Sequence, residues 1–203
     1  FLTIASSLAL SHAAQAVVTS VPGPGGATFL VSDNTLGGAA DVSYSEPGAF
    51  GGEDTGQADS WNGDRRWGNG GSATIASWSF EGLASGTYDV YASWRNDPQA
   101  NVSLAHYTGT DGFATIDLDQ RIGAGALPGI ILNDGTRDIN FALLGSVSIA
   151  DGIFIASVDD SVTGSADPNS FIFADSVAIT QIPEPSALAL VGLSALALFR
   201  RRR

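Results

Sequence analysis

The stretch Gly86-Thr87-Tyr88-Asp89-Val90-Tyr91-Ala92-Ser93-Trp94 (GTYDVYASW) decides the fold. Its side chains divide between two faces at every second position. One face carries Tyr88, Val90, Ala92 and Trp94, and the other carries Asp89, Tyr91, Ser93 and Arg95. A period of two with one apolar face is typical of a strand in an antiparallel sheet. We therefore expect the first face to point into a core and the second to face water.

Segments of the same kind follow one another along the chain, separated by turns rich in Gly, Asp and Asn. They are residues 28–32, 73–80, 102–107, 112–118, 127–132, 137–144, 152–158 and 171–180. Residues 37–71 read as a long Gly-rich loop region with short strands, and 17–27 as a Pro/Gly linker. The spacing predicts an all-β fold, an antiparallel jelly-roll-like β-sandwich over residues 28–181.

The two ends of the chain have a different composition. Residues 1–16 contain an apolar run followed by Ala14-Gln15-Ala16, as expected for the remainder of a secretory signal peptide; the alternative is a buried N-terminal strand. At the other end, Pro183-Glu184-Pro185 precedes the uncharged run 186–199 and then Arg200-Arg201-Arg202-Arg203. A helix over that run would be roughly 21 Å long, shorter than the ~30 Å hydrocarbon core. Because cations beside such a segment stay cytoplasmic, the preceding chain is expected outside.

This succession over residues 182–203 resembles the PEP-CTERM sorting signal of Gram-negative bacteria. The resemblance implies export, transient anchoring in the inner membrane by the short C-terminal hydrophobic helix, and recognition of Pro183, Glu184 and Pro185 by an exosortase. The protein would then reach the cell surface or extracellular matrix. The alternative is an ordinary C-terminal membrane anchor flanked by Arg200, Arg201, Arg202 and Arg203.

The charge of the intervening region narrows the choice of partners. When the four terminal arginines and Glu184 are left out of the count, the chain has five arginines and 20 acidic residues, so the formal charge of the region between the two ends is −15. Such a surface repels phosphate backbones, so no nucleic acid partner is expected. The chain has no cysteine, so stability has to come from the core rather than from disulfides.

A second resemblance covers roughly residues 29–180. It rests on the segments Gly86–Trp94 (GTYDVYASW) and Ala174–Ile179 (ADSVAI), together with Asp33-Asn34 and the tryptophans of the Gly-rich loop. These resemble the golvesin C-terminal-like domain, a galactose-binding-like sandwich attached to secreted polysaccharide lyases and other hydrolases. The usual Trp-x-x-Leu-Gly is missing from 127–148. The resemblance implies a non-catalytic accessory domain associated with carbohydrate, without specified ligand residues.

The segment Trp61-Asn62-Gly63-Asp64-Arg65-Arg66-Trp67 is the predicted ligand site. Trp61 and Trp67 could stack on a sugar ring, while Asn62, Asp64 and Arg65 could bind its hydroxyl groups. The alternative is that the tryptophans cover one end of the sandwich and the arginines pair with nearby acids. Trp78 and Trp94 are expected in the core, and Asp175 is expected to bind turn backbone groups.

Enzymatic alternatives have weaker support in the sequence. A nucleophilic site would have to use His106, yet Gly-x-Ser-x-Gly does not occur. Asp117 and Asp119, on one strand face, could form a glycosidase-type pair, as could the adjacent Asp159 and Asp160. Asp-rich loops could hold a structural calcium, although no cofactor is required. We expect a non-enzymatic surface or matrix protein that associates with extracellular polysaccharide; the alternatives are a purely structural surface protein and a polysaccharide-degrading enzyme.

Overall fold

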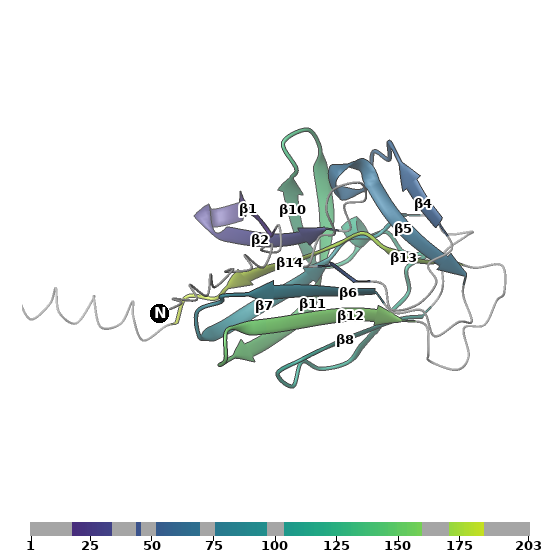
Figure 1. The fold of residues 1–203 in the computed structure, drawn as a ribbon. Helices are drawn as coiled ribbons and strands as arrows, with labels where there is room; N and C mark the ends of the chain where they lie inside the picture. Colours follow the sequence, from purple (N-terminus) through teal and green to yellow (C-terminus); the bar gives the residue numbers. More distant parts are fainter. Residues whose placement is uncertain are drawn as a thin grey trace, which may run out of the picture.

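The computed structural model describes residues 18–33, 44–45, 52–69, 76–96, 104–159 and 171–184. They form an all-β, antiparallel sandwich, as the sequence predicts (Figure 1). The predicted signal peptide (1–16), Pro185, the hydrophobic segment 186–199 and the arginine cluster lie outside these residues. No helix of the described part is long and apolar enough to cross a membrane.

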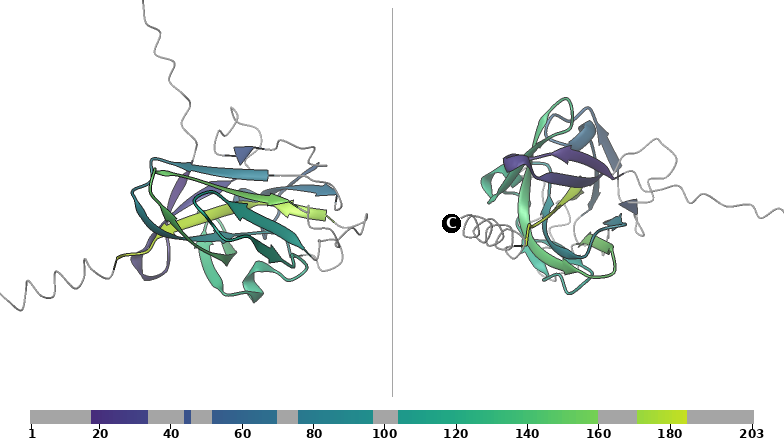
Figure 2. Two further views of the ribbon diagram at one scale, coloured as in Figure 1. Left: turned by 90° about the horizontal axis from the view of Figure 1, so that it is seen from below. Right: turned by 90° about the vertical axis from the view of Figure 1, so that its left-hand side faces the viewer.

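Two sheets form the layers of the sandwich, and a third lies at one end (Figures 1 and 2). The six-stranded sheet has the order β1 (Thr19–Pro22), β2 (Thr28–Asp33), β14 (Ser176–Gln181), β7 (Gly86–Ala92), β11 (Asp138–Ile149) and β10 (Gly129–Asn133). The five-stranded sheet has the order β3 (Tyr44–Ser45), β6 (Ala76–Glu81), β12 (Ile153–Asp159), β8 (Ala105–Gly109) and β9 (Ile116–Leu118). The small sheet consists of β13 (Phe171–Ala174), β5 (Asp64–Asn69) and β4 (Gly52–Thr55).

The main core fills the space between the two large sheets. Trp78 and Phe80 of β6 face Val90 of β7, and Phe154 of β12 packs beside them; each is at most 1% exposed. Trp94, which follows β7, is also buried and donates its indole N–H to the carbonyl of Ile122 at 2.9 Å. The expectation that Trp78 and Trp94 belong to the core is confirmed.

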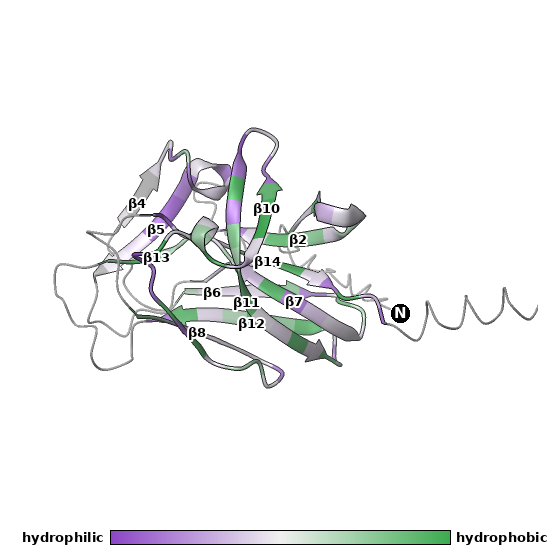
Figure 3. Ribbon diagram, turned by 180° about the vertical axis from the view of Figure 1, so that it is seen from behind, coloured by the Kyte–Doolittle hydropathy of each residue, from purple (hydrophilic) through white to green (hydrophobic). Residues whose placement is uncertain are grey.

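A second core covers the opposite face of the six-stranded sheet. Two of the strands that supply it, β2 and β10, carry hydrophobic positions, drawn green in Figure 3. This core contains Phe29, Tyr91, Leu132, Phe141 and Trp61, each of them buried. The prediction of a water-facing side for β7 is therefore wrong at Tyr91, which is 7% exposed and makes an edge-to-face contact with Phe29 at 5.8 Å. Local alternation could not show this second layer, because its members come from distant segments.

A β-bulge changes which residues of β11 face the main core. Its register against β7 shifts between Leu143 and Gly145, where Gly145 has a φ of 152°. Up to the shift the main core takes Ala142 and Leu144 at even positions, and after it the same core takes Val147 and Ile149 at odd positions. Inserting a residue in this way re-aims the side chains that follow it.

Two segments differ from the sequence-based prediction. Residues 19–22 lie in the predicted linker but form β1, which pairs with β2 as an edge strand. The predicted final strand 171–180 is interrupted at Asp175, so that β13 joins the small sheet and β14 the six-stranded sheet. The interruption places Asp175 at the junction of two sheets.

Three single-turn 3-10 helices complete the described structure. They are η1 (Pro24–Gly26), η2 (Trp61–Gly63) and η3 (Ala124–Ala126). The second and third of them shape the end of the sandwich that carries the small sheet, where the predicted ligand residues lie.

Candidate functional site

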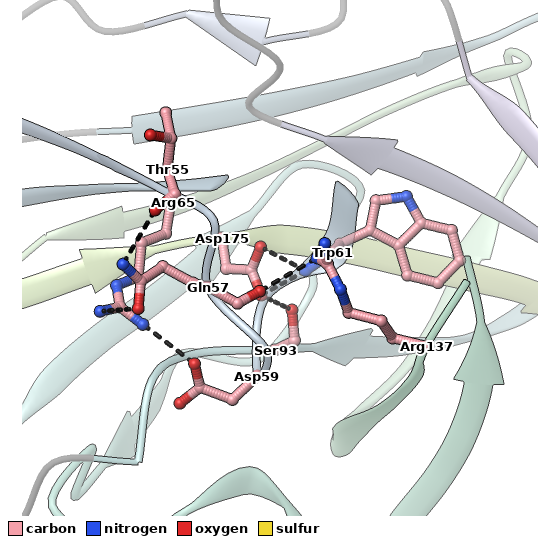
Figure 4. Close-up of polar contacts among 8 residues, drawn as sticks. All are labelled: Thr55, Gln57, Asp59, Trp61, Arg65, Ser93, Arg137 and Asp175. Carbon is pink, nitrogen blue, oxygen red and sulfur yellow. Dashed lines mark hydrogen bonds and ion pairs between the residues drawn. The ribbon is translucent and has the colours of Figure 1, made fainter. Parts of the chain in front are cut away.

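A buried carboxyl group organises the end of the sandwich. Asp175 is 0% exposed, and its Oδ2 accepts a hydrogen bond of 2.6 Å from the hydroxyl of Ser93 (Figure 4). The backbone N–H of Trp61 donates to both of its oxygens, at 3.2 and 3.3 Å. Burial, and secondarily the nearby charge of Asp33, raises the pKa of Asp175 well above its ordinary value. Asp175 thus binds turn backbone, as predicted, and fixes the position of η2.

The turn at η2 sends Trp61 inward rather than toward solvent. Figure 4 shows the indole directed away from Asp175, and the side chain is 1% exposed. It contacts the ring of Phe141 edge-to-face at 5.6 Å in the second core. Trp61 therefore cannot offer a stacking surface to a sugar, and the part assigned to it in the predicted ligand site is replaced by a packing role.

Asn62 ties the same turn to two other segments. It has a left-handed φ of 51°, which asparagine tolerates better than most residues. Its side-chain amide donates to Asp33 at 2.7 Å, and its backbone N–H donates to Asp134 at 3.1 Å. These bonds join η2 to β2 and to the turn between β10 and β11, so the contacts of Asn62 are structural.

Arg65 is a buried cation at the start of β5. Its side chain is 2% exposed, and its guanidinium donates to Asp59 at 3.0 Å and to Gln57 at 3.1 Å (Figure 4). The guanidinium carbon also lies 5.4 Å from the ring centroid of Phe173. The alternative in which Arg65 pairs with a nearby acid is therefore confirmed. Asp64 beside it is 9% exposed, and little of its side chain reaches the surface.

Trp67, one of the predicted ligand residues, lines a hollow. We call this the aromatic hollow; it has a volume of about 200 Å³ and is lined by Trp67, Arg95, Phe171 and Phe173. Trp67 lies opposite Phe173 in the β5–β13 register and meets Phe171 edge-to-face at 4.9 Å. The Arg95 guanidinium carbon lies 5.6 Å from the centroid of the Phe173 ring.

Arg95, Phe171 and Phe173 were not predicted to belong to a site. The phenylalanines belong to a predicted strand, and Arg95 was expected on the water-facing side of its strand, but it is partly buried with its guanidinium over the ring of Phe173, a residue of the main core. They meet Trp67 only because β13 leaves the six-stranded sheet and pairs with β5. An aromatic surface beside a guanidinium can contact the apolar face of a sugar ring while it binds hydroxyl or carboxylate oxygen.

Asp117 and Asp119, which were predicted as a possible acid pair, each have a separate polar partner, and Asp160 of the other predicted pair lies outside the described residues. His106 Nδ1 and Asp117 Oδ1 are 2.6 Å apart across the β8–β9 pair. Asp119 is held by Arg121, whose two nitrogens lie 2.8 and 2.6 Å from its oxygens, and this contact lowers the pKa of Asp119. Within the described ranges no group of three or more His, Asp or Glu side chains is arranged to hold a metal ion. Structural calcium stays an untested prediction.

The C-terminal residues gave a match to a family model. Residues 181–203 match the PEP-CTERM protein-sorting motif. The predicted sorting signal is thereby confirmed, and it indicates an exported protein sorted by an exosortase. Of the motif itself, Pro183 and Glu184 are described and lie exposed just after β14.

Solved structures show similarity to the sandwich. A xanthan lyase from Paenibacillus matches 78% of this chain with a TM-score of 0.55 and 24% identity, and the match covers 13% of the lyase. The Agl-KA catalytic domain matches 70% of the chain at 10% identity with a TM-score of 0.38, covering 27% of that domain. No curated protein matches the chain in sequence. The xanthan lyase match supports the sandwich fold, and the golvesin C-terminal-like assignment stays a prediction.

Proposed function

We propose that this chain is a non-enzymatic component of the cell surface or extracellular matrix whose sandwich associates with exopolysaccharide through the aromatic hollow. The observation that carries the proposal is the grouping of Trp67, Phe171 and Arg95 around one hollow. Sugar rings are bound by such combinations because their C–H faces pack on aromatic rings while their oxygens accept guanidinium hydrogen bonds.

The setting of the hollow supports this choice of ligand. The sorting motif directs the chain out of the cell, where it can meet extracellular polysaccharide. A sandwich of similar fold occurs in a xanthan lyase, as a small part of that enzyme. Arg95 also places a cation in an otherwise acidic chain of net charge −12, which favours a ligand oxygen at this position.

Among the described residues, the two acids with shifted pKa values do not fit the role of a glycosidase general acid. A glycosidase general acid needs a raised pKa and access to the glycosidic oxygen. Asp175 has a raised pKa but is 0% exposed. Asp119 is more accessible, but its pKa is lowered by Arg121, so it stays ionised at neutral pH.

The binding experiment is affinity electrophoresis of the full chain in mild detergent. It measures how far exopolysaccharide from the cells that make this protein retards the migration of the chain. Trp67→Ala and Phe171→Ala should abolish the retardation that the polymer causes. Ile153→Ala is the matched control, because Ile153 is a large apolar residue on β12, is 44% exposed and lies outside the hollow. Unchanged retardation of both folded aromatic variants would refute the assignment of the hollow. No retardation of the unmodified chain would favour the purely structural alternative.

The proposed route to the surface has a separate test. Deleting residues 183–203, or replacing Arg200–Arg203 with serine, should change the final location of the protein in fractionated cells. The physical reason is that the cytoplasmic cation cluster fixes the orientation in which the sorting motif is presented outside. If the deleted form reached the same fraction as the unmodified chain, the proposed role of the motif would be wrong, whatever the sandwich binds.

A further inference from the structure

A second hollow is lined in part by Asp59, the carboxylate that pairs with Arg65. It has a volume of about 410 Å³ and lies between Asp59, the end of the segment after β7, the η3 turn and the start of β11. We call it the amide hollow, because Asn96 and Asn140 line it from two sides. Asp59, Asp138 and the buried Trp94 also line it.

Glycines of the η3 turn fix the positions of both amides. A Cβ atom on Gly123 would lie 2.8 Å from Cγ of Asn96, and one on Gly125 would lie 2.8 Å from Cγ of Asn140. Both distances are shorter than real Cβ contacts, so any larger residue at either position would displace an amide. The turn sequence Gly123-Ala124-Gly125-Ala126 therefore brings backbone directly against the polar groups of the hollow.

The chemistry of the lining matches an uncharged polyol. Each asparagine amide offers both a donor and an acceptor, as a sugar hydroxyl does. The two carboxylates accept hydrogen bonds from hydroxyl groups but repel an anionic ligand. Asp59 is balanced by Arg65 at 3.0 Å, whereas Asp138 accepts a hydrogen bond of 2.7 Å from the neutral side-chain amide of Asn133.

Arg65 connects the two hollows. One end of its guanidinium contacts Asp59 in the amide hollow, and its face lies 5.4 Å from the ring of Phe173 in the aromatic hollow. On its other side, the amide hollow shares Ala124, Gly125 and Asn140 with an apolar hollow of about 460 Å³. Hollows that succeed one another over a surface suit a chain of sugar units better than a single small molecule.

We infer that the amide hollow binds an uncharged, hydroxyl-rich sugar unit through Asn96 and Asn140, with Asp59 and Asp138 excluding acidic units. The inference rests on the proposed function, since it takes this unit to belong to the polymer that contacts the aromatic hollow. It goes further, because it assigns the two hollows different sugar chemistries.

The experiment is an amide chemical-shift titration of the ¹⁵N-labelled full chain in zwitterionic detergent. The probes are methyl β-D-glucopyranoside, methyl α-D-mannopyranoside and sodium glucuronate. A neutral probe should shift the amides of residues 96, 123–126 and 140, and glucuronate should not. Asn140→Ala should weaken neutral-probe binding about fivefold, the usual effect of one lost hydrogen bond. Gly125→Ala should weaken it as well, because it displaces Asn140 without removing any polar group.

The matched control is Gln181→Ala, which removes an exposed amide opposite Tyr88, at the other end of the sheet. The inference would be overturned if glucuronate bound in the amide hollow as tightly as the neutral probes. It would also be overturned if the neutral probes shifted only the amides of residues 67 and 171. The latter result would leave the proposed function standing. A different pair of results would support the amide hollow and refute the aromatic one. In that case neutral probes would shift the amides of residues 96 and 140, while Trp67→Ala would leave polymer binding unchanged.

Discussion

Two tryptophans six residues apart are expected to respond in opposite ways to the same substitution. Trp61→Ala should destabilise the fold, whereas Trp67→Ala should chiefly remove polysaccharide binding. Trp61 is 1% exposed and packs on Phe141, whereas Trp67 is half-buried and borders the aromatic hollow. The pair therefore separates structural contributions from binding contributions within a single segment.

The expected loss for Trp61→Ala follows from its burial. A buried tryptophan removes about 200 Å² from water, which at about 25 cal/mol/Å² amounts to ~5 kcal/mol. Measured Trp→Ala substitutions in cores lie at about 3–5 kcal/mol, so we expect the free energy of unfolding to fall by about 4 kcal/mol. This is a large part of the roughly 5–15 kcal/mol that stabilises a typical domain. For the half-buried Trp67 we expect about 1–2 kcal/mol.

Urea unfolding followed by far-UV circular dichroism measures both losses, and affinity electrophoresis measures binding on the same samples. A loss below about 1 kcal/mol for Trp61→Ala would contradict the packing role of the η2 turn. A folded Trp61→Ala protein that no longer binds polymer, beside a Trp67→Ala protein that still does, would reverse the assignment of the two residues. Phe at position 61 is the matched conservative variant, and it should recover part of the lost stability.

Three further substitutions test other parts of the structure. Because the pKa of Asp175 is raised, the folded state holds a proton on this carboxyl group at pH values where the unfolded state has released it. The contribution of the protonated carboxyl group to the free energy of unfolding is fully present below about pH 4, and it is lost as pH rises through the folded-state pKa. Asp175→Asn should flatten that pH dependence in urea unfolding, and an unchanged slope would contradict it. Gly129→Ala should destabilise by about 2 kcal/mol or more, since its Cβ would collide with the carbonyl oxygen of Phe141; a thermal midpoint equal to that of the unmodified chain would refute the β10–β11 register. Arg121→Ala should raise the pKa of Asp119 toward its ordinary value, which carboxyl chemical shifts between pH 2 and 6 measure. The ion pair stabilises the fold slightly, and this contribution is lost as pH falls through the lowered pKa; the variant should lack it at every pH.

The candidate site shows where local patterns stop being informative. The alternation in Gly86–Trp94 placed Trp94 in the core, and this position is observed. The loop around Trp61 looked like a ligand site because its residue types suit sugar binding. Whether a tryptophan in a Gly-rich loop faces solvent depends on what lies beneath it, and here the neighbour is Phe141, far along the chain.

The sequence by itself determined the all-β class, the sandwich and the sorting motif, because each is written in neighbouring residues: alternation within a strand, turn residues between strands, and one contiguous signal at the end of the chain. Only the tertiary structure decided that Trp61 is a core residue and that Trp67 borders a hollow. Those roles depend on partners far apart in sequence, such as the bond from Trp61 to Asp175 across 114 positions. Such contacts follow from which strand edges pair and which faces become covered, and a period of two along one segment carries no information about either.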